Sequence, residues 1–279
     1  MLIVDSGSTK TDWAILDGSK PTLYSSRGIN PSSDHTFITL SEHSAELATR
    51  TSEITDIHYY GAGVIDQITK DKIRSWLKLY FINAQIISVN SDLLGACRAL
   101  AGRKKGLISI LGTGCNSCLY DGTNITDNIP SLGFIVSNEG AGTDIGRAIL
   151  KSYFYRQMPE RVKLEFESKY AIHKSSVVRS LYQESNPTSY LAGYARFINE
   201  TSDSEWRKSI VYPLFQTFID TRIKTYSQYM SYELYFVGSI AYFCSDILKE
   251  ILENNNLRGA MILQKPIDGL IIYHTKTQA

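Results

Sequence analysis

A short strand that ends in an aspartate and a glycine-threonine turn opens the chain, and it constrains the fold more than any other feature. Residues 2–4 are apolar, Asp5 follows them, and residues 6–11 supply glycine, serine, threonine and lysine before a second apolar stretch. Glycine lets the backbone approach an anion closely, and successive N–H groups and hydroxyls then donate to it. The pattern predicts a phosphate-binding hairpin, with an ordinary turn aspartate as the alternative.

The same unit occurs a second time further along the chain. Residues 107–111 are mostly apolar, residues 112–114 read Gly-Thr-Gly, and the Asp-Gly pair at 121–122 closes this hairpin as the pair at 17–18 closes the first. Two such units predict an internal duplication. Two facing turns would grip a polyphosphate from both sides, with Asp5 holding Mg²⁺ directly or through water.

Composition excludes several classes of partner. The chain has 279 residues, and its 29 Lys+Arg against 28 Asp+Glu give a net charge of +1 without a long block of like charge. This balance argues against a nucleic-acid-binding or membrane-surface protein, and no apolar run reaches the roughly 20 residues of a membrane span. We therefore expect a cytoplasmic globular protein of two domains. We expect reduced, buried cysteines, because these four lack disulfide or zinc spacing: Cys97, Cys115, Cys118 and Cys244.

Strands and helices alternate after the first hairpin, which predicts a mixed α/β sheet covered by helices. In the first part of the chain we expect strands at 22–26, 54–60 and 84–89 and helices at 36–49, 71–80 and 93–100. In the second part we expect a third hairpin strand, helical segments over 143–157, 160–231 and 242–254, a strand over 232–237, and a short last helix from 266.

Two positions between a strand and a helix are candidates for a site, each with a structural alternative. Asp92 stands at the carboxyl end of a strand, where ligands collect in open α/β sheets, and this position suits a general base. The structural alternative is that Ser91 or Asp92 only caps the following helix. Gly238 admits an adenine ring or serves backbone geometry alone. Residues 140–146 miss the dinucleotide-binding spacing, and no Walker A sequence occurs. Any nucleotide chemistry therefore depends on the paired hairpins.

Four motifs, in this order, resemble the BadF/BadG/BcrA/BcrD-type ATPase family, in the N-acetylglucosamine kinase-like branch of the acetate and sugar kinase, heat-shock chaperone and actin superfamily. The segments that look like its first phosphate motif, connecting segment, second phosphate motif and adenosine motif are residues 5–12, 90–92, 112–116 and 237–239. The family's sugar-contacting loop corresponds to Asn30, and its Gly-Asp-Glu-Gly signature resembles residues 137–140.

The resemblance implies a fold and an activity. It implies two α/β domains of ribonuclease-H-like (actin-like ATPase) fold with a nucleotide cleft between them: residues 1–105, joined by a C-terminal helix at 267–279, and residues 106–266, with a helical insertion. The implied reaction transfers the ATP γ-phosphoryl group to the 6-hydroxyl of N-acetylglucosamine, with Mg²⁺ near Asp5 and Asp92 as base. A homodimer is implied by analogy.

The resemblance also assigns site residues. The cofactor-binding residues would be Gly7, Ser8, Thr9, Lys10, Thr11, Gly112, Thr113, Gly114, Asn116, Gly238 and Ser239. The sugar-binding residues would be Asn30, Gly133, Asn138 and Glu139.

Two departures from the family pattern keep other functions open. Asn138 stands where sugar kinases of this branch usually have Asp, and Leu132 occupies a position often held by Trp. One rival is an ATP-driven activator of a radical dehydratase, which needs cysteines to hold an iron–sulfur cluster between two subunits. The other is a nucleotide-gated sugar sensor without turnover.

Overall fold

The chain folds into two compact units, which are described separately. The computed structural model describes residues 1–18, 20–29, 31, 37–183, 186–257 and 260–277. The first unit comprises Met1–Lys105, Tyr120–Thr126 and Lys265–Ala279, and the second comprises Gly106–Leu119 and Asp127–Gln264. Asn30, the predicted sugar contact, lies outside the described residues.

The first unit contains a five-stranded mixed sheet in the order β3-β2-β1-β4-β5. Its strands are β1 (Leu2–Ser6), β2 (Lys10–Ile15), β3 (Thr22–Arg27), β4 (Asp56–Gly61) and β5 (Ile86–Ser91). Strands β1, β2 and β3 form an antiparallel meander, whereas β4 pairs in parallel with both β1 and β5. The parallel strands therefore end at one edge, where Asp5 lies in β1 and Asp92 directly follows β5.

The second sheet repeats this topology. Its strands are β6 (Gly106–Leu111), β7 (Cys115–Tyr120), β8 (Ile125–Ile129), β9 (Leu234–Val237) and β10 (Ala260–Leu263). Their order, read from β8, is β8-β7-β6-β9-β10, and β9 pairs in parallel with both β6 and β10. Each sheet thus has a hairpin, a third meander strand and two parallel strands in the same places. The two α/β sheets confirm the predicted fold class.

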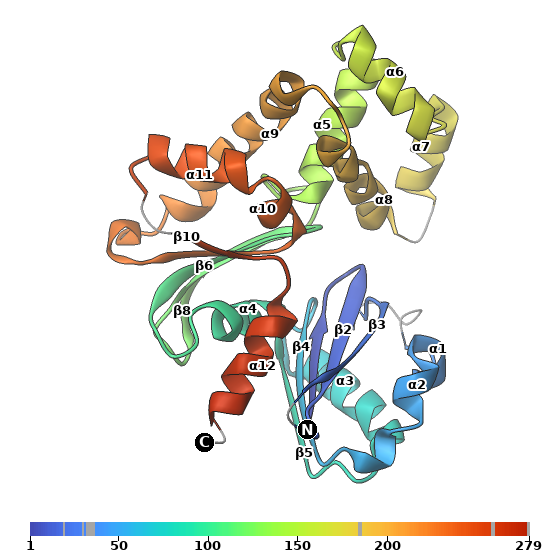
Figure 1. The fold of residues 1–279 in the computed structure, drawn as a ribbon, viewed down its shortest axis with the longest axis vertical. Coiled ribbons are helices and arrows are strands. Elements are labelled where there is room, and N and C mark those ends of the chain that lie inside the picture. The colour runs from blue at the N-terminus through green and yellow to red at the C-terminus, as the bar shows by residue number, and fades with distance from the viewer. Residues whose placement is uncertain (19, 30, 32–36, 184–185, 258–259, 278–279) are drawn as a thin grey trace. The chain divides into compact units, whose positions relative to one another are not determined.

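Helices pack on both faces of the first sheet (Figure 1). Side chains alternate along β1, so Leu2 and Val4 join one apolar core and Ile3 joins another. Helix α3 (Gln67–Tyr80) covers the first core, while α4 (Asp92–Leu100) and α12 (Pro266–Thr277) pack together over the second. The last helix of the chain therefore completes the first unit.

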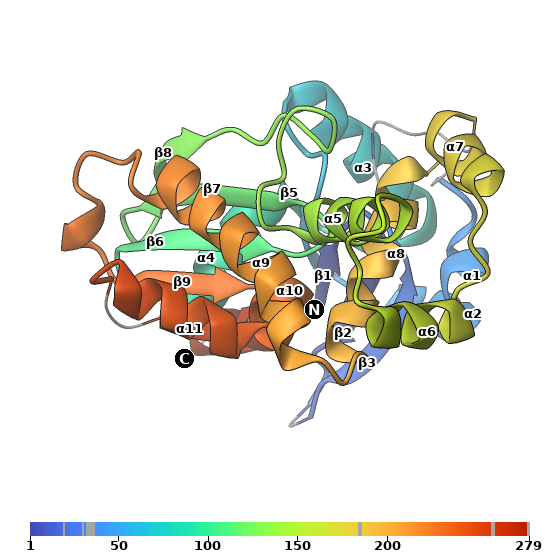
Figure 2. The same ribbon diagram turned by 90° about the horizontal axis from the view of Figure 1, so that it is seen from above.

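Helices also cover the second sheet, where α5, α9 and α11 lie over one face (Figures 1 and 2). Their apolar side chains form one large core with β6 and β9, and α6 to α8 extend it beside α5. The helices are α5 (Gly142–Phe154), α6 (Glu160–Lys169), α7 (Lys174–Tyr182), α8 (Pro187–Tyr194), α9 (Ser204–Phe218), α10 (Ser239–Phe243) and α11 (Ser245–Asn254). None of the helices in the described part of the chain has the length and apolarity needed to cross a membrane.

Two expected helices are interrupted. In place of one helix over 36–49 the described residues form α1 (Leu40–His43) and α2 (Ala45–Ala48), because Ser44 is extended (φ −158°) and its hydroxyl accepts the Leu47 N–H. Cys244 separates α10 from α11, but its backbone is not extended (φ −109°) and its side chain does not cap α11. Strand β10 was not expected at all.

Candidate active site

The first glycine-threonine turn lies between β1 and β2 and packs against Gly28. The Gly28 N–H donates to the Thr9 carbonyl (3.1 Å), and a Cβ on Gly28 would lie 2.3 Å from the Gly7 carbonyl oxygen and 2.6 Å from that of Ser8. The carbonyls of residues 7–9 thus lie against Gly28. Because the peptide bonds are trans, the N–H groups of residues 8–10 point to the opposite side. Such a row of donors is a concavity for an anion.

Some side chains of this turn are exposed, and another is buried and stabilises the turn. Ser8, Thr9 and Lys10 are exposed. Thr11 is fully buried instead, and its hydroxyl lies 2.8 Å from the hydroxyl of Ser6. Thr11 therefore stabilises the hairpin from inside, and its assignment as a cofactor contact stays a prediction.

Three carboxylates gather at the ends of the strands beside this turn: Asp5, Asp12 and Asp92. Desolvation, reinforced by the charges of Asp12 and Asp92, raises the pKa of Asp5 to about 8. Lys10 offsets part of this charge through its ion pair with Asp12, at 2.7 Å. The folded unit therefore favours the protonated form of Asp5, and a divalent cation bound beside it would favour the ionised form instead.

The donor set fits a magnesium ion held mainly through water. Mg²⁺ prefers oxygen ligands, keeps several waters, and usually takes one or two carboxylates plus substrate phosphates. Among the described residues no three His, Cys, Asp or Glu side chains are arranged to hold a metal ion by themselves. Asp5 would thus hold the ion together with the nucleotide.

Asp92 begins α4, but the cap of this helix is its neighbour. The Ser91 hydroxyl accepts the Leu94 N–H at 3.3 Å, as an N-cap does. Oδ1 of Asp92 accepts the Leu93 N–H at 2.8 Å, and desolvation raises the pKa of the carboxyl group. The carboxylate is thus not needed as the cap, and a raised pKa suits a general base.

The second turn, between β6 and β7, packs against the start of α5. The Gly142 N–H donates to the Gly112 carbonyl (2.8 Å), and the Thr143 N–H donates to the Thr113 carbonyl (3.1 Å). Across trans peptides, the N–H groups of Thr113 and Gly114 therefore point away from α5. Among the described residues other than its two chain neighbours, none has an atom within 4 Å of a Cβ added at Gly112. The N–H groups of this turn thus point away from the neighbouring backbone, as those of the first turn do.

The side chain of Asn138 forms hydrogen bonds that stabilise the second turn. Its side chain is buried and its backbone has a positive φ of 79°. The Oδ1 atom accepts the Cys115 N–H and the Ser131 hydroxyl, each at 3.2 Å, and Nδ2 donates to the Thr143 hydroxyl at 3.2 Å. These partners use most of its hydrogen-bonding capacity. Its assignment as a sugar ligand stays a prediction, while its bracing contacts are observed.

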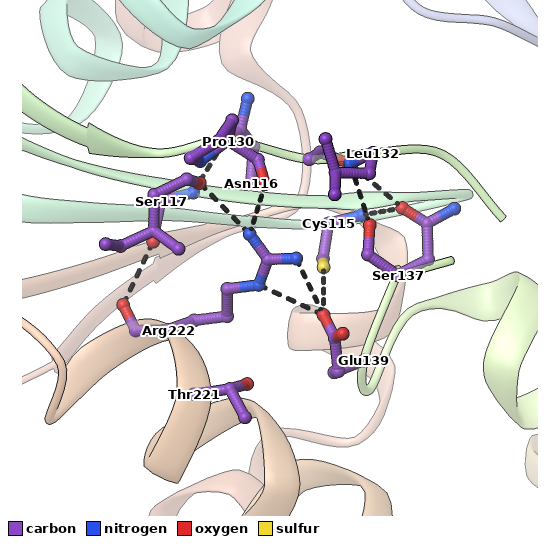
Figure 3. A network of polar contacts seen from close by, with 12 residues as sticks. Cys115, Asn116, Ser117, Pro130, Leu132, Ser137, Glu139, Thr221 and Arg222 are labelled. Atoms are coloured by element: carbon purple, nitrogen blue, oxygen red, sulfur yellow. Dashed lines mark hydrogen bonds and ion pairs between the residues drawn. The ribbon is translucent and has the colours of Figure 1, made fainter. Parts of the chain in front are cut away.

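Glu139 is held by an arginine that the sequence patterns did not single out (Figure 3). Arg222 is almost fully buried and donates to Oε2 of Glu139 through Nε (3.0 Å) and Nη2 (2.9 Å). Cys115 lies 3.7 Å from the same oxygen, and desolvation raises the pKa of its thiol to about 12. Cys115 is therefore a neutral neighbour of the carboxylate.

The remaining predicted residues of this unit differ in their surroundings. Gly238 has a φ of 122°, and a Cβ there would lie 2.3 Å from the Leu111 carbonyl oxygen, so backbone geometry alone requires glycine. Ser239 is exposed at the start of α10. Asn116 accepts hydrogen bonds from its own strand and from Asn128, and Gly133 lies exposed in the loop after β8 with a φ of 81°.

Each unit thus brings part of the predicted site together. In the first unit these residues are Asp5, the turn at 7–11 and Asp92; in the second they are the turn at 112–114, Asn138 and Glu139. Sequence reasoning missed Gly28, Gly142 and Arg222. The two glycines carry a usable signal, since each occurs where an element begins or ends, but nothing local marks Arg222.

None of the four cysteines forms a disulfide, and all four are buried. An iron–sulfur cluster shared between two subunits would need thiols at the surface. The burial of all four therefore weighs against the activator reading.

A solved structure from Porphyromonas gingivalis, of a candidate N-acetylglucosamine kinase, superposes on this chain with a TM-score of 0.92. The two sequences are 33% identical, and the match covers 100% of both chains. The chain belongs to the N-acetylglucosamine kinase-like branch of the actin-like ATPase superfamily. This confirms the predicted relationship.

Other solved structures share the fold of this kinase-like branch. A candidate N-acetylglucosamine kinase from Chromobacterium violaceum has a TM-score of 0.69 at 13% identity, with 98% of both chains covered. A ROK family glucokinase from Streptomyces griseus, in complex with glucose and AMPPNP, has a TM-score of 0.54 at 10% identity, with 95% of this chain and 94% of its own covered. No family model and no curated protein sequence matches the chain.

Proposed function

We propose that the protein is an ATP-dependent sugar kinase that transfers the γ-phosphoryl group of MgATP to a hydroxyl of an amino sugar. The proposed acceptor is N-acetylglucosamine, with the 6-phosphate as product. Support comes from family membership and from the P. gingivalis relative, which is described as a candidate N-acetylglucosamine kinase.

The observation that carries the proposal is the repeated turn. Each sheet has a glycine-threonine turn after its first strand, and both turns direct their carbonyls onto neighbouring backbone and their N–H groups away from it. Phosphoryl transfer needs little covalent help from the protein, because positioning and neutralisation of phosphate charge supply most of the rate. Two such turns are the parts that this chemistry requires.

The remaining roles follow from charge and position. When bound with ATP, Mg²⁺ would neutralise phosphate charge, and Asp5 would hold it. Asp92 would orient the acceptor hydroxyl and take its proton, with Glu139 binding the sugar. Asn30 and the homodimer stay predictions of the family resemblance.

The test is an ADP-release assay with MgATP and single acceptors: N-acetylglucosamine, N-acetylmannosamine, N-acetylmuramic acid, glucosamine and glucose. We expect turnover with one amino sugar. Asp92→Asn should lower kcat by roughly 10² to 10⁴, the usual contribution of a positioned base. It should leave the thermal midpoint unchanged or higher, because Asn keeps an oxygen for the Leu93 N–H and removes a desolvated carboxyl.

Two outcomes would overturn the proposal. ATP hydrolysis that no sugar stimulates would favour the activator reading, and tight sugar binding without ADP release would favour the sensor. Full activity of a folded Asp92→Asn variant would leave the kinase but remove Asp92 from its mechanism.

A further inference from the structure

Arg222 lies in a short π-helix (Ile219–Ile223) that follows α9, far in the sequence from both phosphate turns. Its side chain is only 5% exposed. π-Helical turns interrupt the regular hydrogen bonding of α-helices and occur frequently at functional sites. A buried guanidinium needs partners for its charge and its donors. Among the described residues, the Arg222 guanidinium donates to carbonyls at the end of β8 and to Glu139, in the segment between β8 and α5.

Arg222 holds this segment at two separate places (Figure 3). Nη1 donates to the carbonyls of Ile129 (3.0 Å) and Pro130 (2.8 Å), at the end of β8. Nε and Nη2 both donate to Oε2 of Glu139. The Arg222 carbonyl also accepts the Ser117 hydroxyl at 2.9 Å, which ties the π-helix to β7.

The two carboxylate oxygens of Glu139 have different surroundings. All hydrogen bonds that this carboxylate accepts from the described residues go to Oε2. Oε1 has no such bond, and the side chain is 22% exposed. Glu139 also stands between two residues with positive φ, Asn138 and Gly140, so its backbone conformation is unusually constrained. One oxygen is thus fixed by the protein and the other remains for a ligand.

We infer that Arg222 is a positioning residue that fixes Glu139 so that Oε1 accepts hydrogen bonds from the hydroxyls of the sugar acceptor. The inference rests on the proposed kinase function. It also links the acceptor site to the phosphate turn, because Asn138, next to Glu139, accepts the N–H of Cys115 at the end of that turn. Removal of the guanidinium would therefore affect the position of Glu139 in the acceptor site more than the conformation of the phosphate turn.

The test compares Arg222→Met, Arg222→Lys and Glu139→Gln by the KM of N-acetylglucosamine and the KM of ATP. We expect Arg222→Met to raise the sugar KM roughly 10- to 100-fold, the range known for groups that orient ligands of metal sites, and the ATP KM by much less. Arg222→Lys keeps the charge but loses the planar fork, so its sugar KM should lie between those of the wild type and Arg222→Met.

A double variant separates positioning from general destabilisation. If Arg222 acts through Glu139, the sugar KM of Arg222→Met/Glu139→Gln should equal that of Glu139→Gln alone, because residues that act through each other are not additive. The matched control is Arg207→Met, which removes another arginine–carboxylate ion pair of the same unit, that between Arg207 and Asp246 at 2.6 Å. It should lower the thermal midpoint without a selective rise of the sugar KM.

The failures of this inference and of the proposed function differ. Suppose the wild type phosphorylates a sugar. If the Arg222 variants then raise both KM values equally, or if the effects in the double variant are additive, the inference about Arg222 fails while the proposed function stands. A wild type that phosphorylates no sugar would overturn the proposed function and this inference with it. If Arg222→Met does not fold, Arg222→Lys provides the test. A rise of its sugar KM that exceeds the rise of its ATP KM supports the role of Arg222, and equal rises overturn it.

Discussion

At the scale of single residues, the titration of Asp92 makes a kinetic prediction. A protonated carboxyl cannot accept the proton of the acceptor hydroxyl, and desolvation raises the pKa of Asp92 above the 3.8 of a free aspartate side chain. We therefore expect kcat/KM to rise with pH along an acid limb whose midpoint lies above 3.8. A pH–rate profile for the phosphorylated sugar measures it. A profile that stays flat down to the ordinary aspartate range would contradict the assignment.

Asp5 makes a prediction about stability, whose sign follows from its pKa of about 8 against 3.8 for a free side chain. The folded state favours the protonated form, so this contribution to the free energy of unfolding is complete below the lower value and is lost as pH rises through the higher one. Asp5→Asn should therefore gain in thermal midpoint over the wild type as pH increases from 5 to 9 in the presence of EDTA.

The control for Asp5 is the metal. MgATP should raise the midpoint of the wild type more than that of Asp5→Asn, because the cation offsets the carboxylate charge that destabilises the free protein. A midpoint difference between the two proteins that does not depend on pH would mean that Asp5 is ordinarily ionised in the folded state.

At the scale of elements, Gly28 limits the shape of the first turn. A methyl group there would lie 2.3 Å from the Gly7 carbonyl oxygen, which is backbone and cannot move away without displacing the turn. We expect Gly28→Ala to lower the free energy of unfolding by about 1–3 kcal/mol, the usual cost of overpacking, and to raise the KM of ATP more than that of the sugar.

Gly193→Ala is the matched control for this element, because a Cβ added there would have no atom within 4 Å in the part of the chain that the structure describes, apart from its chain neighbours and its own helix backbone. It lies in α8, where alanine is also the better helix former, so stability and both KM values should be unchanged or slightly improved. Chemical denaturation and steady-state kinetics test both variants. An ATP KM equal to that of the wild type in Gly28→Ala would mean that the turn does not hold the nucleotide.

The elements also indicate how far sequence reasoning reaches. Apolar periodicity and the Asp-Gly pairs predicted both hairpins and most strands, because those signals are local. The breaks at Ser44 and Cys244 were not predicted. The pattern of polar and apolar residues continues across each of them, whereas the helical backbone conformation is interrupted there. The contacts of Asn138 and Arg222 join segments that are distant in sequence, so only the folded chain reveals them.

At the scale of the whole molecule, the chain builds two units of one topology and then returns to the first. Helix α12 follows β10 of the second sheet, yet it packs on α4 and β1 of the first unit. Its Ile267 and Leu270 are buried in the core that Ile3 and Tyr60 also form. The first unit is therefore completed only after the rest of the chain has been made.

The close packing of α12 on α4 gives the last prediction. A Cβ on Gly269 would lie 2.2 Å from the Ala99 carbonyl oxygen, so Gly269→Val should force the two helices apart. We expect a lower thermal midpoint and faster proteolytic cleavage in residues 265–277, since a helix that loses its packing opens locally. Ile272→Ala alters an exposed side chain of the same helix, 54% accessible, and should change neither quantity appreciably. Equal cleavage of both variants would mean that the close packing of Gly269 on Ala99 contributes little to the docking of α12 on the first unit.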